Sequence, residues 1–340
     1  MKTKLLNLLP TAALTLFATT SSQAQTVPVT VDNFVRAESD LYFSNVAKDG
    51  GFGKFVHRRE PAAVENQTVI RLNRDTLYTA VVFDLEASPA TITLPDAGAR
   101  FMSLMVVNED HYVPLVAYGA GSYTLTKEKF GTRYVLIGIR TLVDPAKPED
   151  VKQVHALQDA MKIEQANAGK LELPEWDSAS QKKVRDALLV LATTMPDFKQ
   201  CFGTREHVNP IRHLVGSAAA WGGNPDQDAT YLNFTPPKND GTTAYRLAVK
   251  DVPVDGFWSI SVYNAKGYFE PNKNNAYSVN NLTAKKDADG SVAIQFGGDP
   301  TGATNYLPIT VGWNYTVRLY RPRKEILDGT WKFPEPQPVK

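Results

Sequence analysis

The chain has 340 residues, with 37 Lys and Arg against 36 Asp and Glu, and it contains one cysteine. The near-neutral balance, without a basic stripe, argues against a protein that binds nucleic acid. Because Cys201 has no partner cysteine in the chain, an internal disulfide is excluded and the fold must depend on its hydrophobic core.

The segment Met1–Ala24 has the pattern of a secretory signal peptide. Lys2 and Lys4 give it a positive start, and Leu5–Ala18 is an apolar run too short to span a bilayer. Small residues before the end of the segment predict cleavage after Ala24. No later apolar run reaches membrane length, so we expect an exported protein of the periplasm or the extracellular space, without membrane insertion.

The first part of the mature sequence changes from a helix pattern to strand patterns. Asp32 is a candidate cap for a helix that ends at Gly50 and Gly51. Residues rich in Val, Ile, Thr, Tyr and Phe then predict short strands separated by turns of Gly, Pro and Asp. These strands are Thr68–Leu72, Thr76–Leu85, Thr91–Leu94 and Tyr134–Ile139.

The middle of the chain has helical periodicity, and the strand pattern returns after it. Apolar residues recur every three or four positions over 151–161 and 184–191, and Asn209 followed by Pro210 predicts the start of a third helix. From Ala229 the sequence again predicts short strands, and the proline-rich tail Trp331–Lys340 predicts an extended arm. The expected organisation is a signal peptide (1–24), an N-terminal β module (25–145), a helical bridge (146–223) and a C-terminal β module with a tail (224–340).

Two segments of the chain match each other at a constant offset. The stretch FMSLMVVNEDHY, which begins at Phe101, matches FWSISVYNAKGY, which begins at Phe257, so that Asn108 pairs with Asn264. A second match aligns GTRYVLIGIR with GWNYTVRLYR and pairs Arg140 with Arg321. A repeat at fixed spacing indicates duplicated structural units. We therefore predict a mainly β fold with two related sandwich or jelly-roll modules and a helical insert between them.

Several phrases of the sequence resemble one family of exported bacterial proteins. They include RLNRDTLYTAVVFDL, RFMSLMVVNEDHY, VKDVPVDGFWSISVYNAKGYFEPN and RLYRPRKEILDGTWKFPEPQPV. Members of this family join two consecutive domains of unknown function, the twelve-fifty-four and twelve-fourteen types. The resemblance covers nearly the whole mature chain and implies two β modules with an intervening helical element. It implies no activity and supplies no catalytic or ligand-binding residues.

The repeat suggests one candidate catalytic group. After the shared asparagine, the first copy has Glu109, Asp110 and His111 where the second copy has Ala-Lys-Gly. Two carboxylates beside a histidine are suited to acid–base catalysis or to metal binding. The alternative is that the acids are exposed turn residues and that His111 is a surface or half-buried histidine.

Further residues are candidates for ligand binding. Arg74 and Asp75 precede a predicted strand that contains Tyr78, an arrangement suited to a carboxylate or phosphate group, although an internal ion pair explains it equally well. Asn108 stands beside the acidic group. The C-terminal module is rich in aromatic residues, among them Trp258 and Tyr263, which suit either the core or a platform for a sugar.

The chain lacks the familiar catalytic signatures. It has no G-x-S-x-G elbow, H-E-x-x-H pair, Walker loop, Rossmann fingerprint or C-x-x-C pair. We therefore favour an exported protein that binds a polar small molecule, a glycan or a protein partner through loops of its β modules. The alternatives are a hydrolase or metal-assisted enzyme that uses the carboxylate and histidine group, and an oligomeric envelope assembly protein. No cofactor or metal is assigned.

Overall fold

The first β module is a sandwich of two sheets. The computed structural model describes residues 26–67 and 69–339, and the predicted signal peptide lies outside the described residues. A five-stranded sheet, in the order β1-β2-β7-β4-β5, faces a three-stranded sheet in the order β6-β3-β8. Apolar side chains such as Phe83, Ile92 and Ile137 fill the space between the two sheets. The strands are β1 (Val56–His57), β2 (Thr76–Asp84), β3 (Ala90–Leu94), β4 (Met102–Asn108), β5 (Leu115–Tyr118), β6 (Gly121–Leu125), β7 (Tyr134–Leu142) and β8 (Lys162–Gln165).

The second β module repeats this architecture with two four-stranded sheets. One has the order β12-β11-β15-β9 and the other has the order β14-β13-β10-β16. Their core includes Trp313, Phe296 and Ile260, which are almost completely buried. The strands are β9 (Ala229–Phe234), β10 (Tyr245–Val249), β11 (Trp258–Tyr263), β12 (Ser278–Asn280), β13 (Val292–Phe296), β14 (Tyr306–Leu307), β15 (Asn314–Tyr320) and β16 (Gln337–Pro338). In the tail, Phe333 joins the core and β16 pairs with β10.

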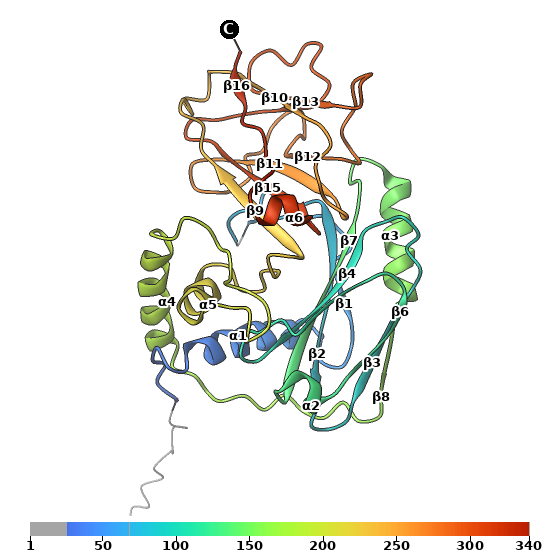
Figure 1. The fold of residues 1–340 in the computed structure, drawn as a ribbon. Coiled ribbons are helices and arrows are strands. Elements are labelled where there is room, and N and C mark those ends of the chain that lie inside the picture. The colour runs from blue at the N-terminus through green and yellow to red at the C-terminus, as the bar shows by residue number, and fades with distance from the viewer. Residues whose placement is uncertain (1–25, 68, 340) are drawn as a thin grey trace, which may run out of the picture.

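The helices lie on the first module and beside the junction of the two modules (Figure 1). Apolar residues of three helices, including Phe34, Leu188 and Val215, form one cluster, and Phe43 packs against Val82 on the five-stranded sheet. The longer helices are α1 (Phe34–Lys48), α3 (Pro148–Ala160), α4 (Ser178–Ala192) and α5 (Pro210–Ala219), and α2 (Lys127–Phe130) and α6 (Lys324–Leu327) are single turns. Within the described residues, no helix combines the length and the apolar character that a membrane span requires.

Three local predictions differ from the structure. Residues 69–72 form turns instead of a strand, because the amide of Arg71, at φ 53°, donates to the carbonyl of Gly267 in the other module. Asn33, not Asp32, is the residue before α1. Within the predicted helical bridge, residues 162–165 form β8, because their alternating side chains pair with β3 at the edge of the first sandwich.

The predicted duplication is confirmed by the strand order. The order β2-β7-β4-β5 in the first module corresponds to β9-β15-β11-β12 in the second. The pairs β2–β7 and β7–β4 are antiparallel, and so are the equivalent pairs β9–β15 and β15–β11. Phe101 and Phe257 precede the equivalent strands β4 and β11, and Asn108 and Asn264 stand at their ends. Each asparagine accepts the amides two and four residues later, so the turns that follow are also equivalent.

The second predicted match, which aligned GTRYVLIGIR with GWNYTVRLYR, is wrong by three residues. Ser103 on β4 pairs with Arg140 on β7, whereas the equivalent Ser259 on β11 pairs with Arg318 on β15. The counterpart of Arg140 is therefore Arg318, not Arg321. The turns before the two strands differ, because a helical turn, α2, precedes β7 and the short strand β14 precedes β15.

Equivalent residues of the two modules meet at their junction. The rings of Phe101 and Phe257 are 5.0 Å apart, and Tyr320 stacks on Phe257 at 4.2 Å. Together with Leu142 and Ala229 these residues form an apolar cluster between the sandwiches. This cluster therefore packs the two sandwiches against each other at their junction.

Candidate functional site

The turn that carries His111 is buried under α5. The φ angle of His111 is 61°, and the equivalent Gly267 has a φ of 85°, so the histidine occupies a left-handed position that normally favours glycine. Its Nε2 accepts the amide of Gly222 at 2.8 Å, and its protonated Nδ1 donates to the hydroxyl of Ser217 at 2.7 Å. Burial, together with the neighbouring His213, holds the pKa of His111 well below its ordinary value. The ring is therefore neutral, and both of its nitrogens are engaged.

Glu109 and Asp110 bind Arg36 of α1. The Glu109 carboxylate also accepts the amide of Tyr134 at 2.9 Å and is 5% exposed. Asp110 makes the second contact to Arg36 and remains half exposed. The alternative that this segment is an exposed turn is wrong for Glu109 and His111. The catalytic role of Glu109, Asp110 and His111 stays a prediction, and each of these side chains already has a partner within the protein.

The structure separates the predicted ligand-binding residues into two groups. Arg74 donates to the carbonyl of Ala62 and lies over the ring of Tyr277. The Asn108 side chain accepts the amide of Asp110 within its own turn, and Trp258 lies in the core of the second sandwich. The remaining residues, Asp75, Tyr78 and Tyr263, lie at the junction of the two modules beside two arginines, the partly buried Arg140 and the buried Arg318.

Polar residues at the junction come in equivalent pairs. Tyr78 pairs with Arg140 between β2 and β7, and Tyr231 pairs with Arg318 between β9 and β15. Burial opposes ionisation of Tyr78, but the charge of Arg140 together with hydrogen bonds from Thr76 and Asn73 leaves the pKa of Tyr78 below its ordinary value. The sequence signal for this pairing, which is not among the predictions, is a D-x-x-Y shared by the start of each strand, in Asp75–Tyr78 and in Asp228–Tyr231.

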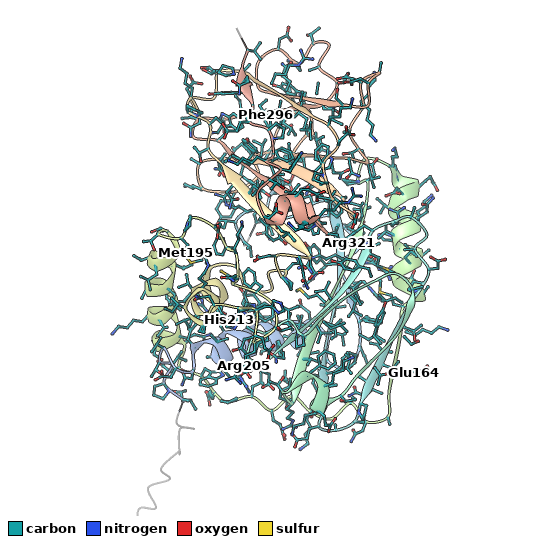
Figure 2. All side chains as sticks on the ribbon, in the orientation of Figure 1. Glu164, Met195, Arg205, His213, Phe296 and Arg321 are labelled. Carbon is teal, nitrogen blue, oxygen red and sulfur yellow. The ribbon has the colours of Figure 1, made fainter. Side chains whose placement is uncertain are left out.

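The two aspartates of this motif each reach into the other module. Asn280 on β12 donates to Asp75 at 3.1 Å, and Tyr118 on β5 donates to Asp228 at 2.8 Å. Tyr118 and Asn280 are equivalent, because each pairs with the corresponding serine of β4 or β11. Arg321, labelled in Figure 2, lies over the ring of Tyr118 at 4.7 Å. The duplicated motif therefore joins the two sandwiches at both ends of their interface.

A cleft of about 360 Å³ lies beside Asp228, and we call it the junction cleft. It is formed by β5, by the loop 199–207, by the segment 225–230 that leads into β9, and by Leu327 of α6. The amide of Val113 donates to the carbonyl of Gly203, and the amide of Gln200 donates to Asp226, so the walls are tied together. Both modules and the bridge contribute to this cleft, which therefore requires the complete fold.

The junction cleft has a polar side and an apolar side. Burial raises the pKa of both Asp226 and Asp228 above their ordinary values. Lys199 and His207 add nitrogen donors. The other polar lining residues are Gln200, Thr204, Gln227 and Thr230, and the apolar ones include Val113, Pro114, Val116, Phe202, Pro225 and Leu327. A second, smaller cleft of about 190 Å³ in the second module is lined by Tyr263 and Glu270 among others.

Within the described residues, the structure shows no group of three or more His, Cys, Asp or Glu side chains arranged to hold a metal ion. The two clefts instead contain mixtures of amides, hydroxyls, carboxylates and apolar side chains. Of the residues predicted from the sequence to form a site, Tyr263 alone lines one of these two clefts.

The models of two protein families match the chain. The first is "Protein of unknown function (DUF1254)", over residues 52–165, and the second is "Protein of unknown function (DUF1214)", over residues 235–324. The chain therefore carries both domains consecutively, which is the pairing that the resemblance implies. The DUF1254 match extends from the region of β1 to β8, and the DUF1214 match contains β10 to β15. Much of the junction cleft, including the loop 199–207 and the segment 225–230, lies outside both matches.

Solved structures share this two-domain fold. The crystal structure of the VPA0106 protein from Vibrio parahaemolyticus has a TM-score of 0.72 and 17% identity, over 91% of this chain and 98% of that one. A putative uncharacterized protein from Burkholderia cenocepacia has a TM-score of 0.52 and 15% identity, over 91% of this chain and 87% of that one. At these identities the likeness concerns the fold alone. Among curated proteins, none matches the chain.

Proposed function

We propose that the protein binds a small polyhydroxylated molecule, such as a mono- or disaccharide, in the junction cleft. The observation that carries this proposal is the carboxylate of Asp228, which is oriented by the Tyr118 hydroxyl at the lining of a cleft of about 360 Å³. Clefts of this size are in the usual range for small-molecule sites in proteins.

The chemistry of the lining fits a ligand with many hydroxyl groups. The Asp226 and Asp228 carboxylates accept hydrogen bonds from hydroxyls, and Lys199 and Gln200 donate to hydroxyl oxygens. The apolar side of the cleft, which includes Phe202, can pack against the C–H face of a sugar ring. The mixture of acidic and basic groups does not favour a ligand of high charge.

The proposal is tested by calorimetric titration of the purified protein with a panel of neutral mono- and disaccharides. At least one sugar should bind the wild type saturably, and D228N should weaken that binding by about tenfold, because a hydrogen bond to a charged group contributes roughly 1.5–3 kcal/mol. Asparagine still accepts a hydrogen bond from Tyr118, so D228N should retain the fold.

The smaller cleft supplies a matched control. Glu270→Gln removes a carboxylate from that cleft and should leave sugar binding unchanged. Binding that E270Q abolishes and D228N does not would move the ligand site to the second module. If no sugar on the panel binds the wild type, the proposal fails.

We also propose that the protein is exported, with cleavage after Ala24. The support is the charge and small-residue pattern of the first 24 residues. Mass spectrometry of the protein purified from its native host should find a chain that starts at Gln25. A chain that retains residues 1–24 after fractionation with the cytoplasm would contradict export.

A further inference from the structure

Arg140 is less well satisfied than its counterpart in the second module. Arg318 donates to the hydroxyl of Ser261 at 2.9 Å, to the hydroxyl of Tyr263 at 2.7 Å and to the carbonyl of Arg71 at 2.8 Å. Three short hydrogen bonds to oxygen therefore compensate for the burial of its charge.

Around Arg140, the two equivalent positions on the neighbouring strand offer no such oxygens. Met105 replaces Ser261 and Val107 replaces Tyr263 at equivalent strand positions. The contacts of the Arg140 guanidinium are long, at 3.9 Å to the Met105 sulfur, 3.4 Å to Asn224 Oδ1 and 3.2 Å to the carbonyl of Gly222. In the described part of the chain Arg140 makes no ion pair, although Tyr78 lies beside it with its ring 5.5 Å from the guanidinium carbon.

Tyrosine hydroxyls around Arg140 also have hydrogens to donate. Tyr231 accepts from the Asn224 amide at 2.8 Å, and Tyr320 accepts from the Asn73 amide at 3.3 Å. Because each oxygen already accepts, its own O–H is directed elsewhere, and across residues 26–67 and 69–339 neither hydroxyl donates to a protein acceptor. Arg140 and Tyr231 both retain partial exposure to solvent, whereas Tyr320 is buried, so solvent reaches the group from the side of Arg140 and Tyr231.

We propose that Arg140, with the hydroxyls of Tyr231 and Tyr320, forms a binding site for a small oxyanion, a carboxylate or a phosphate, between the two modules. The Arg140 guanidinium and the hydroxyls of Tyr231 and Tyr320 can all donate hydrogen bonds, which is what an oxyanion accepts. The planar guanidinium offers two parallel N–H groups to such an anion. This site uses different residues from the junction cleft and does not depend on sugar binding.

The probes are sodium phosphate and sodium acetate, each titrated at constant ionic strength against sodium chloride, with thermal unfolding and calorimetry as readouts. At least one probe should raise the melting temperature of the wild type saturably, because a ligand that binds only the native state stabilises it. The two arms show which oxyanion the site prefers. If neither probe binds saturably, the proposal is overturned.

The duplication provides the control variants. R140M should abolish the anion-dependent shift without lowering the stability of the ligand-free protein, since it removes a partly buried charge that lacks a full set of partners. R318M should lower the stability, because it leaves three acceptors without their donor, while retaining the anion-dependent shift if it folds. If R140M responds to the anion as the wild type does, the site is not at Arg140.

A second variant decides the case if R140M does not fold. Y231F removes one donor and retains the ring, so it should weaken anion binding by about tenfold with little change in the melting temperature of the free protein. Tyr123→Phe, a tyrosine on β6 of the first module, should leave anion binding unchanged. Equal anion affinity in Y231F and the wild type would remove this hydroxyl from the site and overturn the proposed arrangement.

Discussion

Replacement of Asp40 by asparagine should stabilise the protein at neutral pH. Asp40 lies on α1, and its Oδ2 accepts a hydrogen bond from the Trp176 indole at 2.8 Å. Its Oδ1 has no hydrogen-bond partner in the described part of the chain. Burial is the main cause that raises the pKa of Asp40 from its ordinary value of 3.8 to about 6, and nearby Glu109 adds to this effect.

The magnitude follows from the two pKa values of Asp40. The folded-state value exceeds the ordinary value by about two pH units, and each unit is worth ~1.4 kcal/mol, so the ionised carboxylate costs the native state about 3 kcal/mol. Because the folded-state pKa is raised, the contribution of Asp40 to stability is fully present below pH 3.8 and is lost as the pH rises through about 6. Asparagine resembles the protonated carboxyl group and avoids this loss.

The assay is urea denaturation of the wild type and Asp40→Asn at several pH values. The difference in unfolding free energy should be near zero at about pH 3.5, increase between about pH 4 and pH 6, and reach about 3 kcal/mol in favour of D40N above that range. The difference between two proteins cancels the titration of groups that they share. A difference that does not change with pH would refute the reasoning.

An exposed carboxylate provides the control for this experiment. Asp186 on α4 pairs with Lys182 at the surface, so Asp186→Asn should change the stability by less than about 1 kcal/mol and with little pH dependence between about pH 5 and pH 8. A D40N variant that is less stable than the wild type at about pH 8 would show that the Asp40 carboxylate is stabilised by contacts that outweigh its burial.

Three further outcomes are expected. Exchange of Glu109, Asp110 and His111 for the Ala-Lys-Gly of the second module should lower the unfolding free energy, measured by urea denaturation, by about 3 kcal/mol or more. The exchange leaves buried partners unpaired and a void beside Trp221. A change below about 1 kcal/mol would show that the turn tolerates the loss. Asn209→Ala should lower the unfolding free energy by ~1 kcal/mol in the same assay, because the Asn209 side chain caps α5 by accepting the amides of Ile211 and Arg212. An unchanged urea midpoint would mean that Pro210 alone determines where the helix begins. Burial raises the pKa of Cys201 to about 11, so a thiol reagent at about pH 8 should modify it in urea and not in the native protein; rapid modification of the native state would contradict this.

The repeat and the strand pattern determined the fold class. Alternating apolar residues in Thr76–Leu85 and Thr91–Leu94 predict strands, and the structure places β2 and β3 there. Asn209 followed by Pro210 marks the start of α5, because both residue types have a local effect on the backbone. Such signals depend on neighbours within a few positions, so they can be interpreted without the tertiary structure.

The candidate site depended on contacts between distant parts of the chain. The sequence shows that Asp75, Tyr78 and Arg140 are present, but the pairing of Tyr78 with Arg140, and of Tyr231 with Arg318, follows from how β2 pairs with β7 and β9 with β15. The predicted match of Gly131 with Gly312 and of Tyr134 with Tyr315 aligned β7 with β15 in the wrong register. Local sequence similarity does not show which residues of neighbouring strands are paired by hydrogen bonds.

Burial also decided the interpretation of Glu109 and His111. An acidic turn beside a histidine has the composition of a surface loop, and only the packing of α1 and α5 over this turn removes it from solvent. The sequence alone determined two duplicated β modules joined by a helical segment. The tertiary structure decided which polar side chains are paired, which are buried and which face a cleft, because those properties are set by residues that lie far apart in the chain.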